Sequence, residues 1–159
     1  RREDGIIRIC HAARNRWFKG SDHIEAVVLS LKDRYPIDWV MIEDVPHQQA
    51  IKLKAECDIF IDQITDRGGW GYGASSVEAL ALGLTVLTRI NPRAGAFLGD
   101  HPFIDITADT LEAKLVEIIE EPALREDTAR KGRDWVVRHH GIDAVMEKLY
   151  DYYREAGWR

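Results

Sequence analysis

Three cations lie close together in the sequence, at Arg14, Arg16 and Lys19. The guanidinium group of Arg is a planar fork that matches two phosphate oxygens, and the ammonium group of Lys is a flexible point charge. Such a cluster could neutralise a diphosphate, together with the charge that grows on it when a glycosidic bond to it breaks. The same residues would also suit a solvated basic loop, and the local sequence leaves both interpretations open.

A second segment with the chemistry of phosphate binding is 68–83, which reads GGWGYGASSVEALALG. It follows an apolar, strand-like run at 57–63 and leads through glycines and other small residues into a helical pattern at 74–82. The first turn of a helix has unpaired N–H groups and the positive end of the helix dipole, so it favours an anion. Phosphate is the usual anion at such a junction, so the segment points toward a nucleotide or a sugar phosphate.

Glu78 lies three residues after Ser75. This Ser-x-x-Glu spacing is that of a capping box, in which the glutamate only bonds backbone amides, and the local sequence favours that interpretation. The alternative is a carboxylate that accepts hydrogen bonds from both hydroxyls of a ribose. Asp62, just before this segment, either faces a ligand or caps a loop, and Trp70 either stacks on a ring or anchors the glycine loop.

The elements that must position these residues alternate along the chain. Strands are expected from compact apolar runs at 5–12, 37–42, 57–63, 85–90 and 103–107. Helices are expected from apolar residues at helical spacing in 21–34, 47–56, 74–82, 110–121, 123–140 and 142–156. Ser21 is the expected N-cap of its helix, and His11 is expected as a half-buried imidazole with its hydrogen bonds satisfied.

Strands and helices in this alternation form right-handed crossovers and a parallel sheet that is covered on both faces. Ligands of such sheets bind beyond the carboxyl ends of the strands, where the cationic segment and the glycine segment both fall. We therefore expect one Rossmann-like α/β domain over residues 1–159, with C-terminal helices from about residue 123. Aromatic residues of the last helix could dock on another domain, although packing on the chain's own sheet is the favoured expectation.

Composition excludes several classes of function. The formal net charge of −5 argues against a general nucleic-acid-binding surface. No apolar run approaches the length of a membrane span, and the two isolated cysteines suit buried thiols in a reducing cytoplasm. No His, Cys and Asp cluster has metal-ligand spacing. We expect a cytoplasmic protein without a metal site, and the start without Met suits a fragment of a longer chain.

Two motifs in this order resemble the C-terminal, nucleotide-sugar-binding half of GT-B-fold retaining glycosyltransferases of the class called family four. That class has Gly-Arg-Leu-x-x-x-Lys-Gly after a strand, and residues 13–20 read ARNRWFKG, matching at Arg14, Lys19 and Gly20. It later has Glu-Ala-x-Ala-x-Gly-x-Pro-Val, and residues 78–86 read EALALGLTV, with Thr85 in place of Pro. The resemblance covers roughly residues 6–150.

The resemblance implies a role for each matching residue. Arg14 and Lys19 would bind the diphosphate of the donor and stabilise the leaving nucleotide. Glu78 would take the ribose hydroxyls, which reverses the preference for a cap. Phosphate would lie against the start of the helix that follows the glycine turn, at Gly73, Ala74, Ser75 and Ser76. The nucleobase would lie near residues 43–47, with Val45 and Pro46 as the expected contacts.

The chain departs from the class at one position. Members often carry a second glutamate eight positions before the one that matches Glu78, and it contacts the transferred sugar; Trp70 stands there in this chain. Asp62 or Asp66 could substitute, and we count Asp62 among the expected substrate-binding residues without giving it that role. The departure motivates the alternative function, which stays second to the glycosyltransferase interpretation: a non-catalytic nucleotide-binding or protein-interaction module on the same fold.

Enzymes of this class react between two Rossmann-like domains, and this chain has the length of one. We expect a nucleoside-diphosphate sugar as the donor, no metal ion or other cofactor, and sugar transfer only together with an N-terminal acceptor-binding domain. Any membrane association would come through that other half. A receiver-like signalling domain is disfavoured, because it would need an acidic cluster where residues 12–14 read Ala-Ala-Arg.

Overall fold

The computed structural model describes residues 4–67 and 71–158. Within them, five parallel strands form one sheet in the order β2-β1-β3-β4-β5. The strands are β1 (Ile7–Ala12), β2 (Ile37–Ile42), β3 (Ile59–Ile61), β4 (Thr85–Thr88) and β5 (Ile104–Asp105). The helices are α1 (Arg16–Lys19), α2 (Ser21–Leu31), α3 (His47–Ala55), α4 (Ala74–Ala81), α5 (Pro92–Leu98), α6 (Leu111–Glu120), α7 (Pro122–His140) and α8 (Ile142–Glu155). The expected Rossmann-like α/β fold is confirmed.

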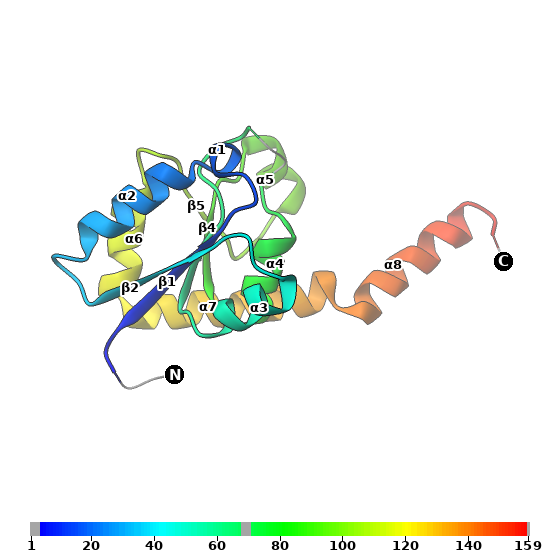
Figure 1. Ribbon diagram of the computed structural model, residues 1–159. Helices are drawn as coiled ribbons and strands as arrows, with labels where there is room; N and C mark the ends of the chain where they lie inside the picture. The colour runs from blue at the N-terminus through cyan, green and yellow to red at the C-terminus, as the bar shows by residue number, and fades with distance from the viewer. Residues whose placement is uncertain (1–3, 68–70, 159) are drawn as a thin grey trace.

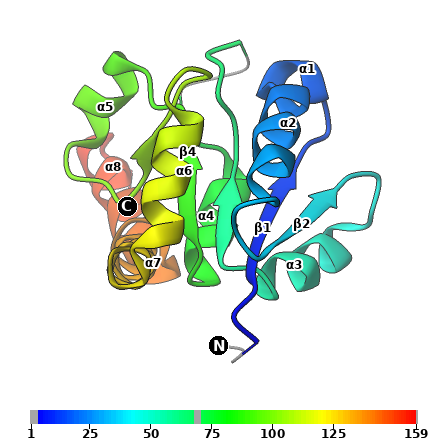
Figure 2. The same ribbon diagram turned by 90° about the vertical axis from the view of Figure 1, so that its left-hand side faces the viewer.

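The core has two layers because successive strand residues point to opposite faces of the sheet. Ile9 and Ile61 belong to a buried apolar cluster with residues of α2 and α6. Cys10 and Phe60 belong to a second cluster with residues of α4 and α7, against which α3 also packs. Figures 1 and 2 show these helices on the two faces of the sheet.

Two short helices, α1 and α5, lie outside the segments in which helical spacing predicts helices. Asn15 precedes α1 and its side chain accepts a hydrogen bond from the Phe18 N–H at 3.1 Å. Asn91 precedes α5 and accepts from the Ala94 N–H at 2.8 Å, with Pro92 at the first helical position. An Asn cap, and Pro directly after one, are helix-start signals in the sequence.

The expected N-cap role of Ser21 is wrong. Ser21 is the first residue of α2, and Gly20 precedes it with a φ of 74°. The Ser21 hydroxyl instead lies 2.7 Å from Nε2 of His11, whose Nδ1 lies 2.7 Å from the Ile61 carbonyl. A carbonyl can only accept, so Nδ1 carries the proton and Nε2 accepts from the hydroxyl. His11 is fully buried rather than half-buried, and burial lowers its pKa to about 4.

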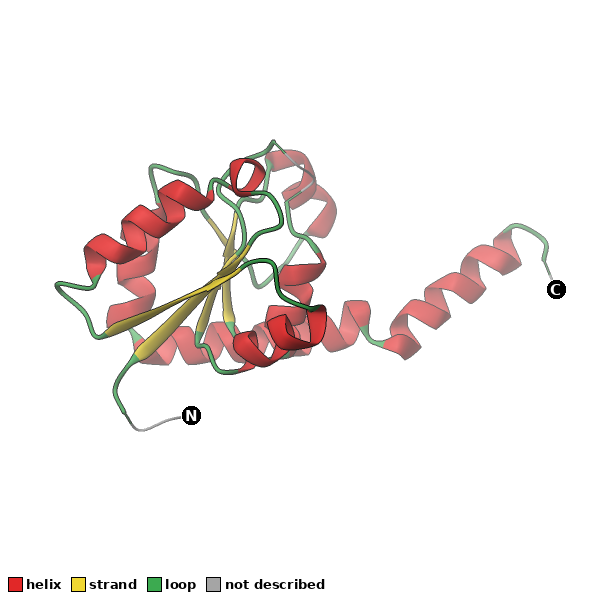
Figure 3. Ribbon diagram, viewed as in Figure 1, coloured by secondary structure: helices red, strands yellow, loops and turns green. Residues whose placement is uncertain are grey.

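The last helix does not pack on the sheet as expected. Figures 1 and 3 show α8 leaving the end of α7 and projecting away from the sheet. None of its residues is buried, and its apolar side chains include exposed Ile142, Val145, Met146 and Tyr150. These positions follow helical spacing, so α8 carries an apolar stripe without a partner among the described residues. None of the helices that the structure describes is long and apolar enough to cross a membrane.

Candidate functional site

The predicted site residues follow three neighbouring strands. Arg14 and Lys19 come after β1, Val45 and Pro46 after β2, and Asp62 and the start of α4 after β3. Because β2, β1 and β3 are adjacent and parallel, these segments meet at one edge of the sheet. The expected assembly at the carboxyl ends of the strands is therefore present.

Lys19 and Asp62 form an ion pair at this edge, between Nζ and Oδ1. The other oxygen of Asp62, Oδ2, accepts from the Ser76 hydroxyl at 2.6 Å and from the Gly73 N–H at 3.4 Å. The Asp62 side chain is only 1% exposed. A carboxylate of the chain itself thus receives three groups that were expected to hold phosphate, and it lies behind them rather than facing solvent.

Other donors at the start of α4 stay open. The N–H groups of Ala74 and Ser75 have no hydrogen-bond partner within residues 4–67 and 71–158. They are in the first turn of the helix, where the dipole favours an anion. An incoming phosphate would therefore meet these two N–H groups and the part of Lys19 that reaches solvent.

The three cations of the first motif have different surroundings. Arg14 is exposed and makes no hydrogen bond or ion pair with any residue that the structure describes. Arg16 contacts three carboxylates and holds α1 and α2 against the end of β2. Its hydrogen bonds, and one from Trp39, hold the pKa of Glu25 below its ordinary value. The partners are Asp22 at 2.7 Å, Glu25 at 2.6 Å and Glu43 at 3.2 Å.

The loop after β3 is fastened to α1. The guanidinium of Arg67 lies 4.4 Å from the centre of the Trp17 ring and donates to the Trp17 carbonyl at 3.3 Å. The Ile64 N–H donates to the Lys19 carbonyl at 3.1 Å. Gly20 lets the two segments approach, since a Cβ there would come 2.6 Å from the Ile64 side chain. These contacts hold Lys19 next to the end of β3.

The capping-box interpretation of Glu78 is wrong. Helix α4 begins at Ala74 and Gly73 is its N-cap, so Ser75 is the second helical residue and cannot form the box. Glu78 Oε1 accepts from Nε2 of His47 at 2.8 Å, and Oε2 accepts from Nζ of Lys54 at 2.7 Å. Burial alone would raise the pKa of Glu78, but these hydrogen bonds outweigh it and hold the pKa below its ordinary value. Glu78 is therefore an ionised, partly exposed carboxylate.

The segment expected near the nucleobase lies next to Glu78. Pro46 is the exposed N-cap of α3, and Val45 before it is half-buried against the apolar cluster of that face. His47, the next residue, is the one that contacts Glu78. The structure thus brings together the segments assigned to the base and to the ribose.

Lys54 is not among the residues predicted from the sequence, although the sequence carries a signal for it. The side chain is 2% exposed and donates to the Ser75 hydroxyl at 2.7 Å as well as to Glu78. In α3, Ala50 and Leu53 pack on the apolar cluster, and Cys57 follows at the same spacing. Lys54 occupies the i+4 position of that stripe, and a cation in an apolar stripe needs a buried partner.

Two further predictions have different outcomes. Asp66 forms an ion pair with Arg89 at 3.4 Å, away from the Lys19 and Glu78 contacts. Trp70 lies outside the described residues. In the part of the chain that is described, no group of three or more His, Cys, Asp or Glu could hold a metal ion.

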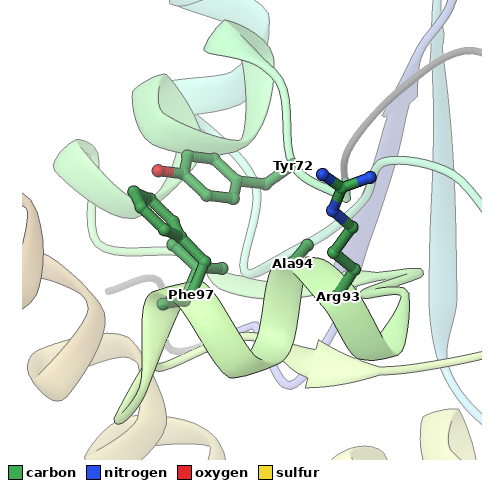
Figure 4. Close-up of a pocket in the computed structure, with 5 residues that line it drawn as sticks. Tyr72, Arg93, Ala94 and Phe97 are labelled. Atoms are coloured by element: carbon green, nitrogen blue, oxygen red, sulfur yellow. The ribbon is translucent and has the colours of Figure 1, made fainter.

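An apolar hollow of about 520 Å³ lies beside this edge, between the glycine segment and α5. Figure 4 shows the rings of Tyr72 and Phe97 on one side of it and the Arg93 side chain on the other. The Tyr72 ring stacks on Phe103, with centroids 4.7 Å apart. None of the predicted substrate-binding residues lines the hollow, and apart from Arg93 its lining is mainly apolar.

Comparison with known proteins identifies the family of this chain and shows which solved structures share its fold. The sequence matches the family described as glycosyl transferase-like over residues 7–151. No curated protein matches it. The C-terminal domain of a glycosyl transferase group 1 family protein (LpcC) from Francisella tularensis is similar in structure, with a TM-score of 0.60, 21% identity and 86% of each chain covered.

Two other solved structures share the fold. UDP-GlcNAc 2-epimerase from Neisseria meningitidis, bound to UDP-GlcNAc, gives a TM-score of 0.60 at 18% identity, over 94% of this chain and 46% of the epimerase. The spinosyn rhamnosyltransferase SpnG gives 0.50 at 15% identity, over 84% of this chain and 41% of SpnG. This chain therefore spans about half the length of both proteins and matches the C-terminal, Rossmann-like half of a GT-B fold.

Proposed function

The chain belongs to the glycosyl transferase-like family, and we propose that it is the donor-binding half of a retaining glycosyltransferase that uses a nucleoside-diphosphate sugar. One observation carries the proposal. Lys19 and the open N–H groups of Ala74 and Ser75 lie at the start of α4, and the partly exposed carboxylate of Glu78 lies one turn further on. This order of positive and negative groups matches the diphosphate and the ribose of such a donor.

In the proposed complex, Arg14 and Lys19 bind the diphosphate together with the first N–H groups of α4. Glu78 accepts the ribose hydroxyls, and the base lies along Val45 and Pro46. Asp62 is too deeply buried to reach the donor, so it acts by holding Lys19 in place. The UDP-GlcNAc bound to the epimerase of the same fold supports a ligand of this class.

Transfer proceeds on one face of the sugar. The bond between the anomeric carbon and the diphosphate oxygen breaks while an acceptor hydroxyl attacks from the same side, and the hydroxyl proton passes to the departing diphosphate. Arg14 and Lys19 stabilise the negative charge that grows on the diphosphate in this step. The proposed chemistry requires no metal ion, because fixed cations carry that charge.

The acceptor would come from an N-terminal domain. This chain covers 46% of the epimerase and 41% of SpnG, so a second half of similar size is expected for a complete enzyme. The apolar stripe of α8 supports this, since it projects from the sheet without a partner among the described residues. We propose that α8 packs on that domain and that the chain alone does not transfer sugar.

Calorimetric titration of the folded chain with UDP, GDP and ADP tests the proposal. One of them is expected to bind at micromolar to millimolar concentration, and more tightly than its nucleoside because of the diphosphate contacts. Binding of none at millimolar concentration, to a protein shown by circular dichroism to be folded, would contradict the proposal. Nucleotide binding without transfer, after the N-terminal half is supplied, would instead favour a non-catalytic module.

A further inference from the structure

We propose that Lys54 is a positioning residue that holds the Glu78 carboxylate in the orientation that receives the ribose hydroxyls. The inference rests on the proposed function, because it concerns how the proposed donor site recognises the ribose. The geometry behind it is a buried ammonium group between the second residue of α4 and the carboxylate one turn later.

The ammonium group of Lys54 has a fixed place. It is at the end of α3, its side chain is 2% exposed, and Nζ lies 5.1 Å from the centre of the Phe60 ring. An ammonium group has three donors. Nζ lies 2.7 Å from both the Ser75 hydroxyl and Glu78 Oε2, and 3.5 Å from the Ser75 carbonyl. These contacts hold the ammonium group in one place, and therefore also the Glu78 carboxylate that it binds.

The two oxygens of Glu78 have different surroundings. Oε2 is bound from the buried side by Lys54, whereas Oε1 is bound by His47, whose side chain is 72% exposed. A carboxylate has about four acceptor positions, so it can keep Lys54 and still receive a diol. His47, at the exposed start of α3, can move away when the ribose arrives. Lys54 then remains as the fixed partner.

A purely structural role explains this pair less well. Replacing a buried ion pair by apolar residues of similar size is often neutral or stabilising, so the pair is weak evidence for added stability. The orientation of Glu78 is what the lysine provides, since a glutamate without it would sample several rotamers in solvent. Lys54 also donates to the Ser75 hydroxyl at 2.7 Å, a contact that does not involve the Ser75 N–H proposed for phosphate.

The test compares nucleoside diphosphates with their 2′-deoxy forms, UDP with dUDP, GDP with dGDP and ADP with dADP. The wild-type chain is expected to bind the ribose form about tenfold more tightly, the effect of one hydrogen bond to a charged group. Lys54→Met should reduce this preference to about twofold or less, with little change in affinity for the deoxy form. Lys52→Met is the matched control, because Lys52 is an exposed lysine of the same helix, and it should keep the preference.

A double variant shows whether Lys54 acts through Glu78. In a Glu78→Gln background, adding Lys54→Met should cause no further loss of ribose preference. Glu78 is partly exposed and stays hydrated without its lysine, so Lys54→Met should fold; if thermal unfolding shows that it does not, Lys54→Gln is used in the same comparison.

The outcomes separate the two claims. If the wild type binds none of the three diphosphates, the proposed function fails. If it binds one with ribose preference and the folded Lys54 variant keeps that preference, the positioning role is overturned while the proposed function stands. Equal binding of ribose and deoxyribose forms by the wild type would overturn the role of Glu78 and of Lys54 together.

Discussion

Two carboxylate–lysine pairs flank the start of α4, and their burial is reversed. In the pair of Asp62 with Lys19, the carboxylate is 1% exposed and the lysine is 21% exposed. In the pair of Lys54 with Glu78, the lysine is 2% exposed and the carboxylate is 27% exposed. Each buried member fixes the exposed one, so the edge presents a cation at the start of the helix and an anion one turn later. That is the order a diphosphate joined to a ribose requires.

The largest effect is expected from removing Asp62, the buried member of the first pair. Asp62→Ala leaves Lys19, the Ser76 hydroxyl and the Gly73 N–H without their shared acceptor, and we expect the free energy of unfolding to fall by about 3 kcal/mol. Urea unfolding measures it. Asp66→Ala, an exposed acid of the same loop paired with Arg89, is the control and should cost about 0.5 kcal/mol. Equal losses in the two variants would contradict a buried anchoring role for Asp62.

His11 differs from the two pairs, because it is buried close to the site but has no exposed partner in the described part of the chain. Its pKa of about 4 in the folded state lies below the ordinary value of 6.5, so the unfolded chain binds a proton first as the pH falls. Stability should decline by about 2 kcal/mol between pH 7 and pH 5 from this group alone. Urea unfolding across that range should show a flatter slope for His11→Gln, and an unchanged slope would refute the assignment.

Arg14 tests the cationic end in isolation, because it has no partner among the described residues and its loss should not disturb folding. Arg14→Ala is expected to weaken nucleoside-diphosphate binding by about 1.5 kcal/mol and to leave nucleoside binding unchanged. Calorimetry with both ligands measures the difference. Lys32→Ala removes one exposed cation at the far end of α2 and serves as the control. A similar loss of affinity in Lys32→Ala would show that the effect of Arg14→Ala comes from the lower positive charge of the protein and not from a contact with the diphosphate.

His47 should show the smallest effect. If the ribose displaces it from Glu78 Oε1, His47→Ala removes a competitor, and affinity for the nucleoside diphosphate should stay within about 0.5 kcal/mol of wild type or rise slightly. Fluorescence or calorimetric titration resolves this. A tenfold loss of affinity would show that His47 itself contacts the nucleotide.

Much of the fold could be predicted from the sequence. The apolar runs of the strands and the helical spacing at 74–82 give the sheet and the start of α4, because both depend on local periodicity. The partners of the charged residues could not be predicted in that way. Lys19 and Asp62 are 43 positions apart, and Lys54 and Glu78 are 24 apart, so only the packing of α1, α3 and α4 brings them together. The same limit applies to α8, whose apolar stripe does not say which surface it covers.

The most direct test of the central claim is a backbone NMR titration of the ¹⁵N-labelled chain with UDP, GDP and ADP in turn. We expect one of them to cause saturable shifts at the amides of Ala74 and Ser75 and around His47 and Glu78, where the diphosphate and ribose are placed. Saturable shifts confined to the Tyr72 and Phe97 hollow, or no shift in a well-folded spectrum, would contradict the claim that the two oppositely buried pairs form the donor site.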